Sequence, residues 1–354
     1  MKDQRKIEFC QAIKEGTSQA MKKFKKSYLI GLGVPDPKGI FGTTLDLKKQ
    51  FGNRRVFDMP VSENGMTGVI IGSAIAGMRP IITHQRVEFS LLAVEQIINQ
   101  AAKWNYMTNG KSNLPIVIRL IIGKGWGQGP QHSQSLEAMF AHIPGLKVVA
   151  PFTPDDAKGL IISSIADKNP IIFFEHRWLH NTIGAVNKKY YTAPIGKGRC
   201  LKKGKDISLI SFSYGSLETL QAAKLLSKFN INAEVIDLRT LRPLDKKIII
   251  DSVKKNKRVL VVDNGWKHFS ISSEVITVIA ENCLNYLKAS PVRMGIEDVP
   301  IPSSPSIAKY CYPTSLQIVE KVLKIFKKNF PNKLSRNKKF YANDIPGDYF
   351  SGPF

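Results

Sequence analysis

The sequence predicts an α/β protein with two domains, each built on a parallel sheet. Segments of strand and helix character alternate along most of the 354 residues, and this alternation is typical of parallel sheets whose strands are joined by helices. The apolar, β-branched stretch Pro115–Ile122 is typical of a central strand that is covered on both faces. A chain of this length exceeds one ordinary domain, so we expect two domains of about 150 residues each.

In the first half, the apolar pattern predicts helices between the strands. Strands are expected at 27–33, 55–58, 80–84, 115–122, 146–151 and 170–175. Helices are expected at 45–51, 65–77, 89–107 and 153–166, of which 89–107 is the longest. Thr43 or Thr44 is expected to cap the first of them, and Thr153 followed by Pro154 is expected to open the last.

The pattern breaks between residues 187 and 205, where the sequence becomes polar, basic and rich in turn residues. We therefore expect a first domain at 1–190, a linker at 191–205, a second domain at 206–328 and a basic tail at 329–354. In the second domain, strands are predicted at 206–211, 233–238, 258–263 and 292–296. Helices are predicted there at 216–229, 246–254, 272–287 and 315–328.

Composition narrows the functional classes. The formal net charge is +24, but the lysines are spread over predicted surface helices, so we favour solvated faces over a nucleic-acid groove. An acidic protein partner would also fit this charge. No apolar run approaches the roughly 20 residues of a membrane span. The absence of a secretory signal and of any C-x-x-C pair among the four cysteines predicts a cytoplasmic protein with reduced, buried thiols.

Glu63 is the first candidate for catalysis. It stands where a short strand, stopped by Pro60, gives way to a helix of small apolar residues. A carboxylate in the first turn of a helix also has a purely structural explanation, because the helix dipole and the free N–H groups stabilise negative charge there. The position alone does not separate these two interpretations.

His132 is the second candidate, because it follows a stretch with glycine at positions 123, 125, 127 and 129. This stretch fits neither G-x-G-x-x-G nor G-x-x-x-x-G-K-[ST], so it is not a nucleotide fingerprint. Glycine does allow a close approach between backbone and ligand. A histidine that only satisfies backbone groups is the alternative. Ser133 or Ser135 is expected to cap the helix that follows.

Several longer runs resemble one family when they are taken together and in order. They are V-F-D-M-P-V-S-E-N-G-M-T-G, A-G-M-R-P, E-Q-I-I-N-Q-A-A-K-W-N-Y-M, Q-H-S-Q-S-L-E-A-M-F-A-H-I-P-G-L-K-V-V-A-P and V-I-D-L-R-T-L-R-P-L-D. With them the chain resembles the β subunits of the first, decarboxylating component of 2-oxoacid dehydrogenase complexes, which are pyruvate dehydrogenase-like and related to transketolase. The resemblance covers residues from about 33 to 328. It implies a pyrimidine-binding domain followed by a transketolase C-terminal domain.

The resemblance also implies roles for individual residues. Glu63 matches the glutamate that binds the aminopyrimidine ring of thiamine diphosphate, and Phe89 and Val61 fall in the segments that hold that ring. His132 matches the active-site histidine of the H-S-Q-S motif. Four positions match main-chain carbonyls that bind a structural potassium ion in many members, although an ordinary helix end is an equally good explanation: Ile116, Ser164, Asp167 and Asn169.

The same resemblance implies partners. Mg²⁺ bridges the diphosphate of the cofactor and requires hard oxygen ligands, which this class of enzyme supplies from a G-D-G motif. The sequence contains no G-D-G. We therefore expect an α subunit that holds Mg²⁺ and the diphosphate, an α₂β₂ heterotetramer with a β–β contact, and a lipoyl-bearing acyltransferase as acceptor.

Two segments, His84–Glu88 and Asp263–Phe269, depart from the family pattern. They favour a substrate other than pyruvate or a branched-chain oxoacid. Two alternatives stay open at this point. One is a transketolase-like or other acyl-thiamine ligating half-enzyme, and the other is a basic, non-catalytic binding subunit.

Overall fold

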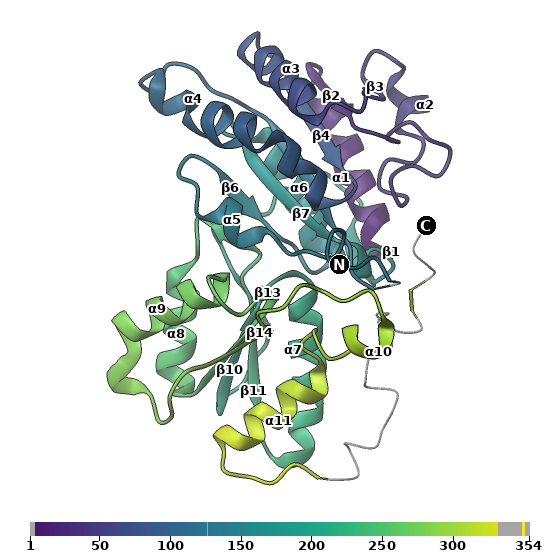
Figure 1. Cartoon of the computed structure of the whole chain (residues 1–354). Coiled ribbons are helices and arrows are strands. Elements are labelled where there is room, and N and C mark those ends of the chain that lie inside the picture. The colour runs from purple at the N-terminus through teal and green to yellow at the C-terminus, as the bar shows by residue number, and fades with distance from the viewer. Residues whose placement is uncertain (1–3, 126, 332–348, 351–354) are drawn as a thin grey trace. The chain divides into compact units, whose positions relative to one another are not determined.

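In the computed structural model, residues 4–125, 127–331 and 349–350 are described. The chain forms two compact units (Figure 1). Unit 1 comprises residues 1–123, 139–195 and 348–354, and unit 2 comprises 124–138 and 196–347. The expected fold class, two α/β domains with mostly parallel sheets, is confirmed. Most of the expected basic tail lies outside the described residues.

Unit 1 contains a parallel sheet with the strand order β6-β7-β5-β4-β2-β3. A separate antiparallel pair joins β1 to β8. The strands of unit 1 are β1 (Gln4–Glu8), β2 (Ser27–Ile30), β3 (Val56–Phe57), β4 (Arg79–His84), β5 (Val117–Ile122), β6 (Lys147–Val149), β7 (Ile171–His176) and β8 (Ile183–Asn187). As expected, β5 is central and entirely buried.

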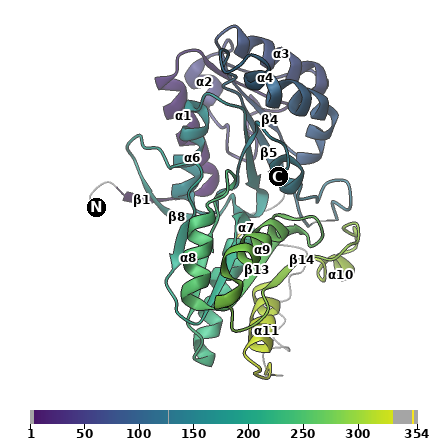
Figure 2. The same cartoon turned by 90° about the vertical axis from the view of Figure 1, so that its left-hand side faces the viewer.

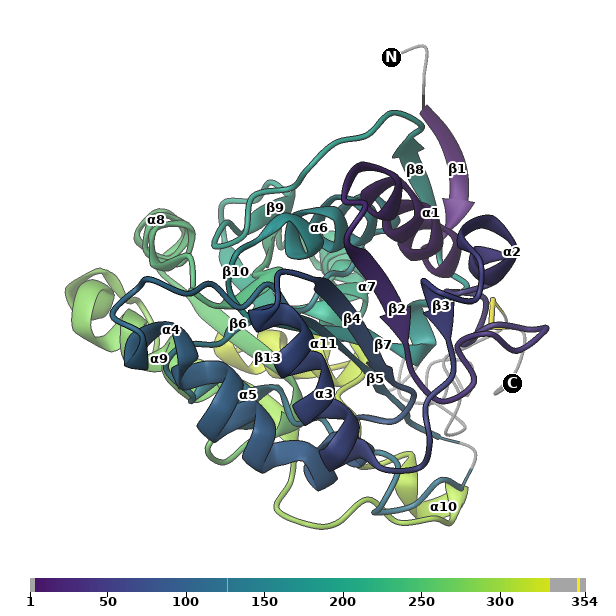
Figure 3. The same ribbon diagram turned by 90° about the horizontal axis from the view of Figure 1, so that it is seen from above.

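The helices of unit 1 cover both faces of this sheet (Figure 3). Helices α1 and α6 lie side by side on one face (Figure 2), where a Cβ added at Gly16 would come within 2.5 Å of Ile161. The helices are α1 (Phe9–Lys23), α2 (Leu47–Phe51), α3 (Glu63–Ile75), η1 (Val87–Ala93), η2 (Gln96–Ala101), α4 (Ala102–Met107), α6 (Pro154–Ala166) and η3 (Arg177–Leu179).

Two local expectations for these helices are corrected by the structure. The helix predicted at 89–107 is a 3-10 segment, a π-helical segment and a short α-helix in succession. Neither Thr43 nor Thr44 caps α2, whose N-cap is Asp46, because the Thr44 hydroxyl accepts a hydrogen bond from the Ile40 amide instead. Thr153 does cap α6, accepting from the Asp156 amide at 3.1 Å.

The core of unit 1 includes a buried ion pair between neighbouring strands β5 and β7. Arg119 donates to Glu175 through Nε at 2.5 Å and through Nη2 at 2.9 Å, and both side chains are fully buried. Burial alone would raise the pKa of Glu175, but Arg119 and His180 lower it overall. Removing one member of such a pair leaves an uncompensated charge.

Unit 2 has a five-stranded sheet in the order β14-β13-β10-β11-β9, in which only β9 is antiparallel to its neighbour. Its strands are β9 (Arg199–Lys202), β10 (Ile207–Ser211), β11 (Ala233–Asp237), β12 (Thr240–Arg242), β13 (Val259–Trp266) and β14 (Val292–Ile296). Its helices are α7 (Ser213–Leu226), η4 (Ser227–Phe229), α8 (Lys246–Asn256), α9 (Ile271–Cys283), η5 (Leu284–Tyr286), α10 (Pro305–Ala308) and α11 (Ser315–Ile325). Strand β9 lies in the stretch expected to be a linker.

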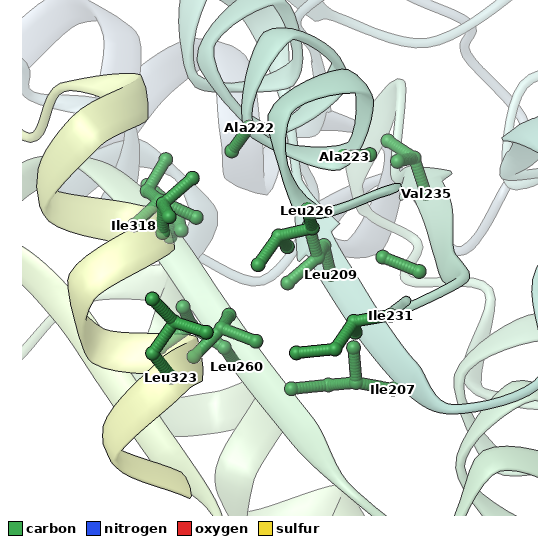
Figure 4. Packing of buried hydrophobic residues seen from close by; sticks show 14 residues of the cluster. Ile207, Leu209, Ala222, Ala223, Leu226, Ile231, Val235, Leu260, Ile318 and Leu323 are labelled. Carbon is green, nitrogen blue, oxygen red and sulfur yellow. The ribbon is translucent and has the colours of Figure 1, made fainter. Parts of the chain in front are cut away.

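One hydrophobic core of unit 2 lies between its sheet and two helices. Figure 4 shows Leu226 of α7 and Ile318 and Leu323 of α11 packed over Leu209 and Leu260 of the sheet. Within unit 2, α7 and α11 pack together on this face, while α8 and α9 cover the other (Figure 1). A rigid α/β scaffold of this kind leaves the loops at the strand ends free to carry function.

None of the helices in the described part of the chain combines the length and the apolar character needed to cross a bilayer. The four cysteines are free thiols. Burial raises the pKa of the Cys10 thiol to about 12, so it stays protonated. The expectation that all four thiols are buried is wrong for Cys200, which is exposed on β9.

Candidate active site

Glu63 is the first residue of helix α3, and only 4% of it is exposed. Ser62, at the N-cap, makes no side-chain cap hydrogen bond, so N–H groups of the first turn are available to stabilise a negative charge. Within the described part of the chain, no residue hydrogen-bonds the Glu63 carboxylate. A buried carboxylate without a partner is costly. Glu63 is therefore better suited to a ligand than to a structural cap.

Apolar side chains with exposed surface are found on the segments around Glu63. Val61 is 81% exposed, and Phe89 on η1 is 37% exposed. Val87, two residues before Phe89, is fully buried in the core. Phe89 is thus the side chain of this segment that can cover a flat ring, and Val61 can contribute a second apolar contact.

Helix α3 buries only one of its faces within unit 1. Thr67, Ile70, Ile71 and Ala74 are buried, and the opposite face includes the exposed Val69. The neighbouring segments η1 and α4 are similar. Their exposed large apolar residues are Leu91, Leu92, Tyr106 and Met107, and Ile75 completes the set on α3. Exposed apolar residues on neighbouring segments are the raw material of an interaction surface.

His132 lies in unit 2, in the loop that precedes the short helix α5 (Glu137–Ala141), and is half-buried. Gly125, Gly127 and Gly129 of this loop have φ angles of +80°, +68° and +66°. Residues other than glycine adopt such φ angles only with strain. A Cβ at Gly129 would lie 2.4 Å from Ser303 Oγ. The glycines therefore allow a tightly packed loop.

The expected helix cap after His132 is absent. The hydroxyl groups of Ser133 and Ser135 are buried, and neither has a hydrogen-bond partner among the described residues. The helix begins at Glu137 instead. Both hydroxyls are thus available to a bound molecule or to water.

The four carbonyl positions of the possible potassium site lie close in sequence to β5, α6 and β7 in unit 1. Ile116 O accepts from the Ile171 amide at 2.9 Å, and Ser164 O accepts from the Asp167 amide at 3.3 Å. Asp167 O accepts from Arg79 Nη1 at 2.8 Å.

Side chains also hold this segment together. The amide and the side chain of Asn169 donate to Asp167 Oδ1 at 2.9 and 3.0 Å, and Lys147 donates to Asp167 Oδ2 at 2.5 Å. With Arg79, two cationic groups already neutralise this helix end. Each carbonyl oxygen keeps a second lone pair that a cation could use.

The two departures from the family pattern differ in exposure. His84 is 2% exposed at the end of β4, and burial lowers its pKa to about 4. It is therefore a neutral core residue at pH 7. In the other segment Asp263 and Asn264 are buried, whereas Phe269 is 97% exposed.

Sequence reasoning missed a buried ionisable cluster in unit 2. Lys124, Glu137, Glu218 and Asp263 are all buried and influence one another electrostatically. The available signal was a lysine inside a glycine-rich stretch. Among the described residues no group of three or more His, Cys, Asp or Glu side chains could hold a metal ion.

Comparison with known proteins identifies both units. Residues 5–181 match the pyrimidine-binding domain of transketolase, and residues 196–318 match the transketolase C-terminal domain. A solved split-gene transketolase, an inactive β4 tetramer, has a TM-score of 0.75 and 22% identity, covering 91% of this chain and 99% of its own. This likeness shows the fold.

Closer relatives are found by sequence. The pyruvate dehydrogenase E1 component subunit beta of Rickettsia bellii is 36% identical, covering 89% of this chain and 97% of its own. The 2-oxoisovalerate dehydrogenase subunit beta of Bacillus subtilis is 41% identical, with 86% and 94% covered. The acetoin:2,6-dichlorophenolindophenol oxidoreductase subunit beta of Cupriavidus necator is 37% identical, with 91% and 98% covered.

Proposed function

The chain belongs to the family of β subunits of the first component of 2-oxoacid dehydrogenases, and we propose that it binds the aminopyrimidine end of thiamine diphosphate and completes an active site with an α subunit. The observation that carries this proposal is the buried Glu63 carboxylate, which has no hydrogen-bond partner among the described residues. A ring nitrogen would supply the missing partner.

Thiamine diphosphate, when bound, supplies a thiazolium carbon that adds to a carbonyl group and accepts the electrons released on decarboxylation. Glu63 would hold the pyrimidine ring through a hydrogen bond to its ring nitrogen and would exchange a proton with it. Burial strengthens this hydrogen bond because water does not compete for the carboxylate. Phe89 and Val61 would cover the ring with apolar surface and keep water away from Glu63.

His132 is assigned to the substrate or the acyl acceptor. Its glycine-flanked loop lets the backbone approach a ligand closely, and its imidazole carries two ring nitrogens that can donate or accept a hydrogen bond. The buried hydroxyls of Ser133 and Ser135 could hydrogen-bond the same ligand. Glu63 and His132 thus have separate tasks, the first on the cofactor and the second on the reacting group.

The exposed apolar residues of α3, η1 and α4 support a subunit interface next to Glu63. We infer that this surface is covered in an α₂β₂ heterotetramer, by the α subunit or by a β–β contact. The α subunit would hold Mg²⁺ and the diphosphate, since the sequence has no G-D-G motif. A lipoyl-bearing acyltransferase is the proposed acceptor.

A structural potassium ion at the carbonyls of Ile116, Ser164, Asp167 and Asn169 is a secondary proposal. Its support is that each oxygen retains a lone pair. Melting curves in KCl and in choline chloride of equal concentration test it, because only a specific site gives a higher Tm in potassium. Equal Tm values in the two salts would remove potassium from the proposal.

Calorimetric titration tests the proposed division of the active site. The isolated chain should bind thiamine diphosphate with Mg²⁺ weakly or not at all, and addition of the α subunit should restore binding. Tight, magnesium-dependent binding by the isolated chain would contradict the two-chain active site.

The assembled complex can then be assayed for substrate. Release of labelled CO₂ from pyruvate and from branched-chain 2-oxoacids, together with oxidation of acetoin, covers the activities named for the relatives above. Transfer of a two-carbon unit between sugar phosphates, without CO₂ release from any oxoacid, would favour the transketolase-like alternative.

A further inference from the structure

Lys124 is buried at the start of the loop that carries His132, with 2% of its surface exposed. Its Nζ donates a hydrogen bond to the main-chain oxygen of Asn264 at 2.7 Å and lies 5.0 Å from the centre of the Tyr312 ring. An ammonium group is costly to bury unless such contacts compensate it. The contacts therefore define where the beginning of the loop lies.

The oxygen that accepts this hydrogen bond belongs to an irregular part of β13. The pairing of β13 with β14 shifts register between Val262 and Trp266, which takes the Asn264 carbonyl out of the regular ladder. The Asn264 side chain is held at both ends, donating to Phe212 O at 2.9 Å and accepting from the Gly215 amide at 2.7 Å. Lys124 is therefore tied to a rigid point at the start of helix α7.

Asp263 makes the same bend of β13 more rigid. Its carboxylate accepts from the Gly265 amide at 3.0 Å and from the Ser272 amide, at the start of α9, at 2.8 Å. The far end of the loop also meets this bend. A Cβ at Gly265 would lie 3.1 Å from Ser135 O, so a side chain here would push the two backbones apart by a few tenths of an ångström.

Carboxyl groups surround the ammonium group. Asp263, Glu137 and Glu218 each attract Lys124, although burial still lowers the pKa of the lysine to about 8. Glu218 is itself held by Tyr214 and by the Ser315 amide. Burial raises the pKa of all three carboxyl groups, that of Glu137 to about 8, and Lys124 counteracts this rise, so loss of the lysine would raise these pKa values further.

The space beside Lys124 is too small for a substrate. Lys124, Asp263 and Tyr312 line a cavity of about 10 Å³, which is about the room that one water molecule needs. Lys124 thus acts on the protein itself and not on a ligand.

We propose that Lys124 is a positioning residue that fixes the His132 loop against the Asp263–Gly265 bend of β13. The role of the loop in turnover rests on the function proposed above for His132. In this proposal the Asp263–Gly265 segment, which departs from the family pattern, orients the loop and does not contact the substrate. A shift of about 1 Å in a catalytic group can cost about 10²-fold in rate, so the anchor matters for turnover.

Hydrogen exchange measured by mass spectrometry on the full chain tests the anchor directly. Lys124→Met should raise the exchange rate of amides in residues 123–135 by roughly tenfold, because the loop opens locally, while amides of β10 stay protected. Lys158→Met is the matched control. Lys158 is also a fully buried lysine, and it donates to main-chain oxygens of residues 187–189 in unit 1, so it reproduces the loss of a buried ammonium group without touching the loop.

Kinetics of the complex with its α subunit give the second measurement. Lys124→Met should lower kcat by about 10²-fold with little change in the KM for thiamine diphosphate. Lys124→Arg, which keeps the charge, should lose less loop protection and less kcat than Lys124→Met. A merely structural lysine would not separate kcat from KM or respond to the retained charge in this way.

The result that overturns the inference is a folded Lys124→Met chain whose loop amides exchange at the wild-type rate. If Lys124→Met does not fold, the comparison of the uncharged variants Lys124→Gln and Lys158→Gln decides, and equal loop exchange in these two variants overturns the inference. The exchange data do not depend on activity. Full turnover by His132→Ala would therefore refute the function proposed for His132. The anchoring of the loop by Lys124 is tested by the hydrogen-exchange rates alone.

Discussion

At Glu63, two physical effects act on one carboxylate. Its position in the first turn of α3 stabilises negative charge, as it would for any acid at a helix start. The residue is only 4% exposed, and its carboxylate has no hydrogen-bond partner among the described residues. The first effect explains why an acid is tolerated there, and the second supports the cofactor-binding role that we propose for Glu63.

We expect Glu63→Gln to lower turnover of the complex by at least about 10²- to 10⁴-fold, because an amide cannot exchange a proton with the ring nitrogen. The Tm should stay near that of the wild type, since the amide occupies the same volume. Glu274→Gln is the control, because Glu274 is an exposed acid in the first turn of α9. Near-normal turnover of Glu63→Gln would exclude Glu63 from the mechanism.

His132→Ala should impair decarboxylation or acyl transfer more than cofactor binding. The physical reason is that Glu63, and not His132, is proposed to bind the pyrimidine ring of the cofactor. Single-turnover kinetics and calorimetric titration of the same complex measure the two effects. The assigned role is wrong for a variant that loses cofactor affinity yet turns over normally at saturation.

At the scale of elements, α3 combines a buried face with an exposed apolar face. Its sequence is apolar on all sides, which is typical of a helix that is buried all round, but unit 1 covers only one side of it. The same contrast is found along η1, η2 and α4, where the helical path changes type twice. Irregular helical segments of this kind are frequent at functional sites.

Val69→Glu should therefore disrupt assembly of the α₂β₂ heterotetramer without unfolding the chain. Val69 is 58% exposed, so the charge is solvated in the isolated chain and would be desolvated in an interface. Size-exclusion chromatography of the mixed subunits measures the loss of complex. Leu284→Glu, at a 63% exposed leucine of η5, is the control that should assemble normally. Equal assembly of both variants would place the interface elsewhere.

At the scale of the whole molecule, buried histidines make stability depend on pH. Burial lowers the pKa of His84 and of His180 to about 4 from an ordinary value of 6.5. Above pH 6.5 both histidines are neutral in the folded and the unfolded chain. Below it the unfolded chain binds protons that the folded chain excludes, so stability falls as the pH drops from 6.5 towards 4.

The expected slope is about 1.4 kcal/mol per pH unit for each of these histidines. His84→Met, which cannot be protonated, should flatten the fall of unfolding free energy between pH 6.5 and 4 by about that slope. Urea unfolding at several pH values measures it. His268→Met is the control, because the His268 side chain is 50% exposed. An unchanged slope in His84→Met would show that His84 does not titrate on unfolding.

Local pattern alone determined the fold class, the strands of both sheets except β9, the Thr153 cap and the choice of Glu63 and His132 as candidates. These features depend on periodicity, on residue type and on neighbours close in the chain, all of which are present in the sequence.

Only the tertiary structure decided which apolar face of α3 is exposed to solvent, and that Val87 is buried while Phe89 is exposed. It also decided that Lys124 donates a hydrogen bond to Asn264. Each of these depends on which distant residues share a surface, as with the 140 positions between Lys124 and Asn264. Such contacts cannot be predicted from the spacing of residues along the chain. Burial, which turns a helix-start acid into a candidate cofactor ligand and a loop lysine into an anchor, is a property of the packed fold.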